Sequence, residues 1–115
     1  MSAANQLQGQ TKQFRGLLII PLVIRWAAGV PSIVSNPLNE AITVADTGTG
    51  DVLLTLADAS LAPIIVGGVI GLGVNQVALK AATTVSTVAI LTDLDNGTAA
   101  DPTDLHVILY KTIAN

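Results

Sequence analysis

The ten residues LLIIPLVIRW, Leu17–Trp26, decide the fold class of this chain. Ile and Val favour the pleated backbone of a β-strand. Alternate residues of a strand point to opposite faces, and here both faces are largely apolar. Such a segment is typical of a strand that is covered on both sides, by another layer of the fold or by another subunit. Pro21 has no amide donor, so we expect a sheet edge or a bulge at that position.

Strand and turn signals alternate through the rest of the chain. We expect further strands at Ile42–Ala45, Val52–Ala57, Pro63–Ile70, Val77–Ala81, Thr84–Thr92 and Leu105–Ile113. Clusters of Asp, Gly, Asn and Pro separate them, which is typical of sandwiches and barrels. No long stretch has helical periodicity. The sequence therefore predicts an all-β fold, a single antiparallel β-sandwich of the jelly-roll-like kind.

The chain divides into an arm and one domain. Residues 1–13 are polar and rich in Gln and Asn, and we expect them to form an extended N-terminal arm. Residues 14–115 are predicted to form the β-sandwich domain, since the 115 residues suit one core. Within this domain, residues 14–40 read as an apolar segment followed by a connection through Pro31 and Pro37.

The composition points to a surface that partners cover. Charged residues make up 11% of the chain and hydrophobic residues 50%, whereas ordinary domains carry about 25% charged residues. Exposed apolar patches usually mark interfaces. The net charge is −3 and the five Lys and Arg residues are scattered, so we expect no nucleic-acid partner. The longest apolar stretches fall short of the roughly 20 residues of a membrane span, so we expect no membrane partner.

The residues suggest no catalytic site, and we expect the protein not to be an enzyme. His106 is the one histidine of the sequence. It could act as a general base for Ser60 or Ser86, but neither serine stands in a G-x-S-x-G setting. We interpret His106 as a residue on the outward face of the last strand.

Two segments invite a ligand-binding interpretation, and the sequence favours neither. The glycines of residues 67–73 lack the Lys-Ser/Thr of a phosphate-binding loop, so we expect a bulge or tight packing there and no cofactor. The acidic stretch from Asp93 departs from the spacing of a calcium loop. A looser calcium site with Asp93, Asp95 and Asp104 stays open as an alternative, although Asp is also an ordinary turn former.

The order of strands and turns from residue 42 to residue 110 resembles that of small bacteriophage structural proteins, of the head-decoration, cement or fibre-tip type. The resemblance lies in Ile42-Thr43-Val44, the turn Asp46–Asp51, a strand of proline and valines, a threonine-rich strand, the loop Asn96–Asp104 and the closing strand Leu105–Leu109. It implies a compact β-sandwich on a virion, often a homotrimer, and it transfers no active-site residues. Because no long shaft repeat precedes these strands, the resemblance favours a decoration or cement protein.

The sequence thus predicts a virion structural protein, made in the host cytoplasm, that stabilises a phage head through oligomeric contacts. Its expected partners are copies of itself, as a homo-oligomer, and the major capsid protein or other virion proteins. We expect no metal, cofactor or catalytic residue. The expected interface residues are those of the arm and the first strand, namely Gln6, Gln8, Gln10, Lys12, Gln13, Phe14, Ile20, Leu22 and Trp26.

Two other functions fit parts of the sequence. One is the tip of a tail or head fibre that recognises a host surface, although aromatic residues make up only 3% of the chain. The other is a small membrane-active, holin-like protein, suggested by the mean hydropathy of +0.64. The Gly and Pro breaks and the β-branched strands count against the second of these.

Overall fold

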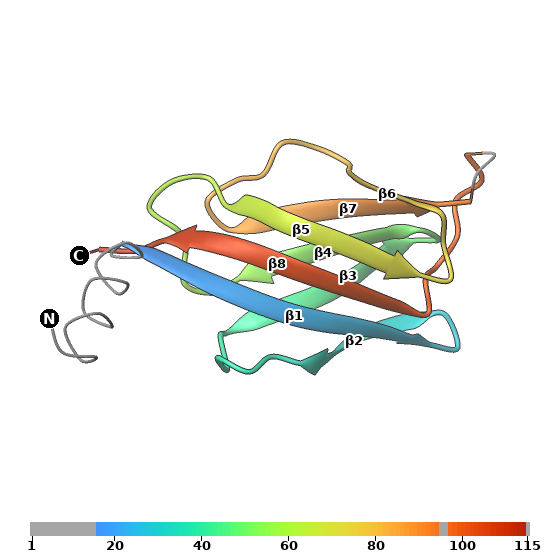
Figure 1. Cartoon of the computed structure of the whole chain (residues 1–115), viewed down its shortest axis with the longest axis horizontal. Helices are drawn as coiled ribbons and strands as arrows, with labels where there is room; N and C mark the ends of the chain where they lie inside the picture. The colour runs from blue at the N-terminus through green and yellow to red at the C-terminus, as the bar shows by residue number, and fades with distance from the viewer. Residues whose placement is uncertain (1–15, 95–96, 115) are drawn as a thin grey trace, which may run out of the picture.

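A computed structural model describes residues 16–94 and 97–114, which form two four-stranded antiparallel sheets (Figure 1). The strands are β1 (Leu17–Ala27), β2 (Val30–Ser35), β3 (Ile42–Gly48), β4 (Asp51–Leu56), β5 (Ile65–Leu72), β6 (Gln76–Leu79), β7 (Thr87–Asp93) and β8 (Asp104–Thr112). The first sheet has the order β2-β1-β8-β5 and the second the order β3-β4-β7-β6. The prediction of an all-β antiparallel sandwich is confirmed. The predicted arm, residues 1–13, lies outside the described residues.

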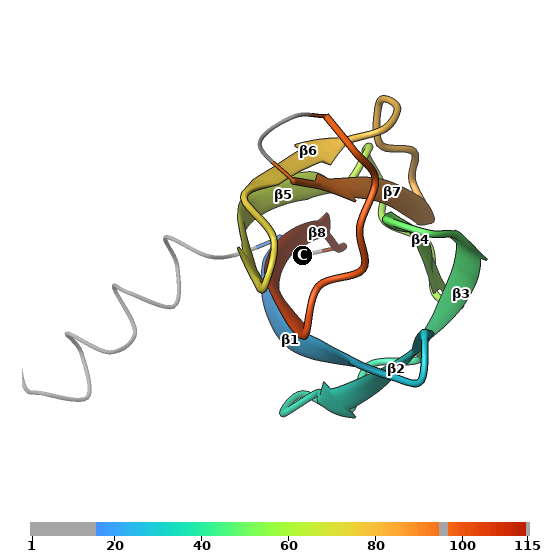
Figure 2. The same ribbon diagram turned by 90° about the vertical axis from the view of Figure 1, so that its right-hand side faces the viewer.

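The core lies between the two sheets and follows the alternation of the sequence. In β4, Val52, Leu54 and Leu56 are buried, while the residues between them are partly exposed. Strands β7 and β8 repeat this pattern. Burying one such side chain stabilises a fold by about 1.5–3 kcal/mol. Figure 2 shows both sheets curving around this common core, with β2 beside β3 and β5 beside β6.

Strand β2 corrects the expectation that the chain after the first strand is only a connection. Residues Val30–Ser35 form a hairpin with β1, and Ala28 and Gly29 join the two strands with φ of 52° and 79°. Two successive left-handed residues give the tight turn that matches the twist of a hairpin. Pro31 is tolerated because β2 is the outermost strand of its sheet.

Strand β1 is paired on both sides along only part of its length. It pairs with β8 from Leu17 to Arg25, but with β2 only from Val23 to Ala27. Among the described residues, the part from Leu17 to Leu22 therefore has no strand on the side away from β8, and Pro21 lies within it. This agrees with the prediction of an edge or a bulge at Pro21.

Candidate functional site

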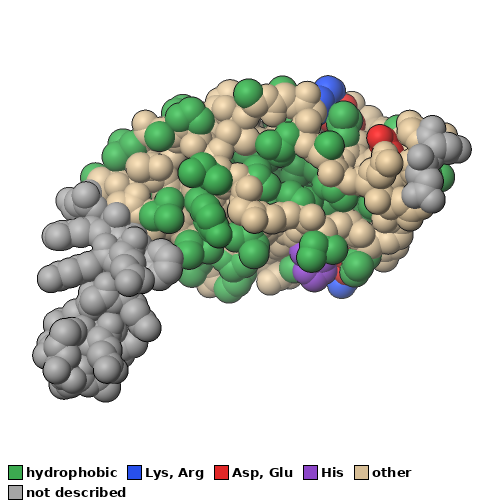
Figure 3. Space-filling view, turned by 45° about the horizontal axis from the view of Figure 1, so that its top comes forward, with side chains coloured by type: hydrophobic (Ala, Val, Ile, Leu, Met, Phe, Trp, Pro, Cys, Tyr) green, Lys and Arg blue, Asp and Glu red, His purple; other side chains and the backbone are tan. Residues whose placement is uncertain are grey.

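The outward side of the first sheet is apolar where a sheet with one solvated side is normally polar. The register places outward-pointing residues of β1, β8 and β5 next to one another. We call these residues the outer face: Ile19, Pro21 and Val23 of β1, His106, Ile108 and Tyr110 of β8, and Ile65, Gly68, Ile70 and Leu72 of β5. Ile70 is 65% exposed, Ile65 54% and Leu72 48%. Figure 3, an oblique view, shows many hydrophobic and few charged side chains at the surface.

The ion pair between Arg25 and Asp104 lies at one end of the outer face. Arg25 donates from Nε to Oδ1 of Asp104 at 2.8 Å and from its terminal nitrogen to Oδ2 at 3.1 Å. The hydrogen bond from Arg25 holds the pKa of Asp104 below its ordinary value, and the same bond raises the pKa of Arg25. The two charges neutralise each other in a two-point contact. The outer face therefore carries no unpaired carboxylate or guanidinium among its described residues.

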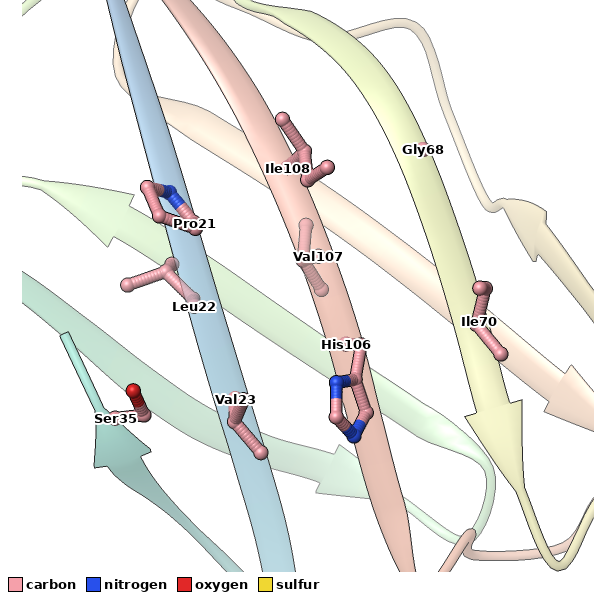
Figure 4. A pocket seen from close by; sticks show the side chains of 9 residues that line it. All are labelled: Pro21, Leu22, Val23, Ser35, Gly68, Ile70, His106, Val107 and Ile108. Carbon is pink, nitrogen blue, oxygen red and sulfur yellow. The ribbon is translucent and has the colours of Figure 1, made fainter. Parts of the chain in front are cut away.

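A hollow of about 340 Å³ crosses the outer face from β2 to β5. Figure 4 shows it with Ser35 on β2, Pro21 and Val23 on β1, His106 and Ile108 on β8, and Gly68 and Ile70 on β5. Its lining is mostly apolar, with the His106 ring and the Ser35 hydroxyl as polar groups. A volume of this size lies in the range of sites that take a small ligand or a large apolar side chain.

Gly68 keeps the hollow open, and no contact within residues 16–94 and 97–114 requires a glycine there. A Cβ atom at Gly67 would lie 2.7 Å from the Tyr110 ring, and one at Gly71 would lie 2.6 Å from Val74. A Cβ atom at Gly68 would meet nothing within 4 Å, and the backbone there is not left-handed. The shift of register between Val66 and Gly68 confirms the predicted bulge.

The structure places the residues predicted for an interface in different environments. The arm residues and Phe14 lie outside the described part of the chain. Ile20 and Leu22 belong to the core, where they are 0% and 2% exposed, and Trp26 is half-buried against it. On β1 the outward positions belong to Ile19, Pro21 and Val23 instead. Alternation shows that these three share a side, but both sides of LLIIPLVIRW are apolar and only the sheet pairing identifies the outward one.

The residues considered for catalysis are apart in the fold. His106 is exposed on the outer face. The Ser60 hydroxyl is buried and accepts a hydrogen bond from the backbone N–H of Thr112 at 2.8 Å. Ser86 lies in the turn before β7, where its N–H donates to the Thr84 hydroxyl at 3.2 Å. No hydrogen bond within residues 16–94 and 97–114 joins His106 to either serine.

The acidic residues serve turns and ion pairs. Asp104 is bound to Arg25, and Asp101 accepts a hydrogen bond from the N–H of Gly50 at 2.8 Å. Asp51 accepts hydrogen bonds from Lys80 and Thr47, and chiefly the bond from Lys80 lowers its pKa. Asp95 lies outside the described residues. Among the residues that are described, no group of three His, Cys, Asp or Glu could hold a metal ion.

No protein-family model, no curated protein and no solved structure matches the chain. In the part of the chain that the structure describes, no helix is long and apolar enough to cross a membrane.

Proposed function

We propose that the chain is a structural protein of a phage particle, which decorates or cements the head by associating through its outer face. The observation that carries this proposal is the apolar character of that face on three adjacent strands. The largest contiguous apolar patch on the surface of a soluble protein is often a functional contact surface. The resemblance of residues 42–110 to phage structural proteins supports the location on a virion.

Burial of the outer face supplies the free energy of association. Each Å² of apolar surface removed from water contributes about 25 cal/mol, so even a small contact is favourable once its geometry fits. A contact that repeats over a shell gains further from the high effective concentration of neighbouring copies. Modest contacts made by many copies are therefore sufficient to hold a coat in place.

The polar arm provides a second contact in this proposal. Segments that become ordered on binding can span a wide surface of the partner. We propose that residues 1–13 reach the major capsid protein or a neighbouring copy, while the outer face joins sandwiches. A variant without residues 1–13 should then bind shells more weakly and keep the self-association of the sandwich.

The test uses phage particles produced with and without the gene for this chain. Peptide mass spectrometry should find the protein in purified wild-type particles at a copy number comparable with that of the shell subunit. Particles without it should release DNA at a lower temperature, and supplied protein should restore their stability. If purified wild-type particles contain none of the protein, the proposed location is wrong.

Two matched variants connect this test to the outer face. Ile70→Lys places a charge on the outer face at the rim of the hollow, so it should abolish the restoration of heat stability. Thr43→Lys places the same charge at an exposed position of β3 in the other sheet, so it should restore stability as the wild type does. Equal restoration by both variants would contradict a role for the outer face.

A further inference from the structure

We propose that the partner of the outer face is the same face of a second copy, related by a two-fold axis, with Ile70 of each copy seated in the hollow above Gly68 of the other. This inference rests on the proposed function, because it names the partner of the surface on which that function depends.

Gly68 is the glycine that leaves the hollow open. A glycine inside a strand weakens the strand, and it is expected where a turn, a bulge or a close approach requires it. The bulge at Gly67 and the packing of Gly71 account for those two glycines. Gly68 has open space above it and an ordinary backbone. No contact among the described residues requires a glycine here, and a group of another copy that approaches the backbone of β5 would require it.

A protruding side chain and the hollow lie side by side on the outer face. Ile70 is 65% exposed, and it stands at the rim of the hollow that Gly68 opens. A two-fold contact uses the same patch on both subunits and must therefore be self-complementary. A projection next to a recess satisfies this condition, because each copy offers one and receives the other.

The described part of the outer face carries no unpaired carboxylate or guanidinium. A buried contact with unpaired charges is strongly unfavourable. Arg25 and Asp104 at the end of the outer face already neutralise each other, and the described residues of β5 that face outward are apolar or glycine. Two copies can therefore bring their outer faces together without burying an unpaired carboxylate, although each chain has a net charge of −3.

The area of the face sets the strength of the expected pairing. Strands about 4.8 Å apart, with a rise of about 3.3 Å per residue, give three strands of roughly eight residues a flat area of roughly 400 Å². Protruding side chains make the accessible surface larger than the flat area, so two such faces together bury roughly 1,000 Å² of accessible surface. This value is at the low end of specific interfaces. We therefore expect a reversible dimer with a dissociation constant in the micromolar range.

The experiment measures the solution mass of the full chain over a concentration series by sedimentation equilibrium. Wild-type protein should change from monomer to dimer across the micromolar range. Gly68→Val places a branched side chain at the position where Ile70 of the other copy would sit and so blocks both insertions, and its dissociation constant should rise at least about 100-fold. Thr43→Val adds the same side chain to the outer side of the second sheet and should pair as the wild type does. Thermal unfolding should show that both variants are folded, and Gly68→Ala provides a smaller filling of the hollow.

A mixture of two variants tests the reciprocal geometry. Gly68→Val keeps the projecting Ile70 and loses the hollow, whereas Ile70→Ser keeps the hollow and loses the projection. Each variant alone has no complete insertion, but a mixed dimer of the two regains one. With one variant labelled at its N-terminus, the mixed dimer should form about tenfold more tightly than either variant pairs with itself.

Three outcomes would overturn the inference: wild-type protein that stays monomeric at high concentration, a wild-type trimer, or folded Gly68→Val that pairs like the wild type. None of them would affect the particle measurements, which report directly on the proposed function. Conversely, a dimer with the expected variant behaviour would stand even if the protein were missing from purified particles.

Discussion

Glycine occupies two contrasting positions in this sandwich. Gly50, in the turn between β3 and β4, has a φ of 66° and lies against the backbone of Thr92 and Ala100. Its N–H donates to Asp101, and its carbonyl accepts the N–H of Thr92 at 2.9 Å. This residue joins the β3–β4 turn to the loop that follows β7. Gly68, in contrast, faces open space.

Gly50→Ala should strongly destabilise the fold. The left-handed backbone costs an L-residue about 1–2 kcal/mol, and the new Cβ would collide with the carbonyl of Thr92 and the amide of Ala100. We expect the free energy of unfolding in urea to fall by about 3 kcal/mol. Gly68→Ala is the control and should leave stability unchanged or raise it by up to about 1 kcal/mol. Equal losses in both variants would contradict this account.

Lys111 is a charged residue on the core side of β8, where it is 7% exposed. Its ammonium lies 3.4 Å from Oε1 of Glu40 in the β2–β3 connection. Glu40→Ala leaves this ammonium without its partner, so it should lower the free energy of unfolding by about 1–3 kcal/mol. Lys111→Met keeps the length of the side chain without the charge and should cost less than about 1 kcal/mol. Chemical denaturation of both variants measures these changes. A larger loss of free energy of unfolding in Lys111→Met than in Glu40→Ala would contradict the expectation.

At the scale of elements, strand β1 combines a free edge with a proline. In the part of the chain that the structure describes, Leu17 to Leu22 pair only with β8, and such an edge offers unpaired backbone groups to other chains. Pro21 lies opposite Ile108 without a donor, so its nitrogen belongs on the side away from β8. The proline thus removes a donor from the exposed edge, a common protection against edge-to-edge pairing.

Pro21→Val should make this edge prone to pairing with strands of other chains. Valine supplies the missing N–H and keeps an apolar side chain of similar size on the outer face. We expect light scattering to rise over hours at concentrations where the wild type is stable, as strands add to the edge. Ile19→Val is the control, since it changes a side chain on the same edge without adding a donor. If scattering by Pro21→Val stays at the wild-type level, the proline does not protect this edge from strand addition.

At the scale of the whole molecule, two surface ion pairs make the free energy of unfolding depend on pH in the acidic range. Arg25–Asp104 lies across β1 and β8, and Lys80–Asp51 reaches from the end of β6 to the start of β4. Hydrogen bonds from the two cations lower the pKa of both carboxyls below the ordinary value of 3.8. A lowered pKa in the folded state means that stability is present above that value and is lost as the pH falls through the lowered pKa.

We therefore expect these pairs to contribute a constant stability from about pH 7 to about pH 5, which is lost progressively below about pH 4. Thermal unfolding over this range measures the effect, which should be modest because exposed pairs are weak. The double variant Asp51→Asn, Asp104→Asn should show a flatter acid dependence. An acid dependence identical to that of the wild type would show that other groups control it.

Much of the fold could be predicted from the sequence, because alternation is a local property of strands. The buried positions of β4 and β8 and the turn at Gly50 follow from residues next to one another in the chain. Strand β2 could not be predicted in this way, since Pro31 resembles a break until the hairpin with β1 places it at a sheet edge.

The candidate site depended on tertiary structure. The segment LLIIPLVIRW predicts a strand that is apolar on both sides, but a sequence with two apolar sides does not determine which one enters the core. The pairing of β1 with β8, and of β8 with β5, places Ile20 inside and brings Ile19, Ile108 and Ile70 to one outward face. Residues that are far apart in the chain become one surface only through these long-range pairings. The sequence by itself therefore determined the strands and their apolar composition, while the register between the strands decided where the apolar excess lies.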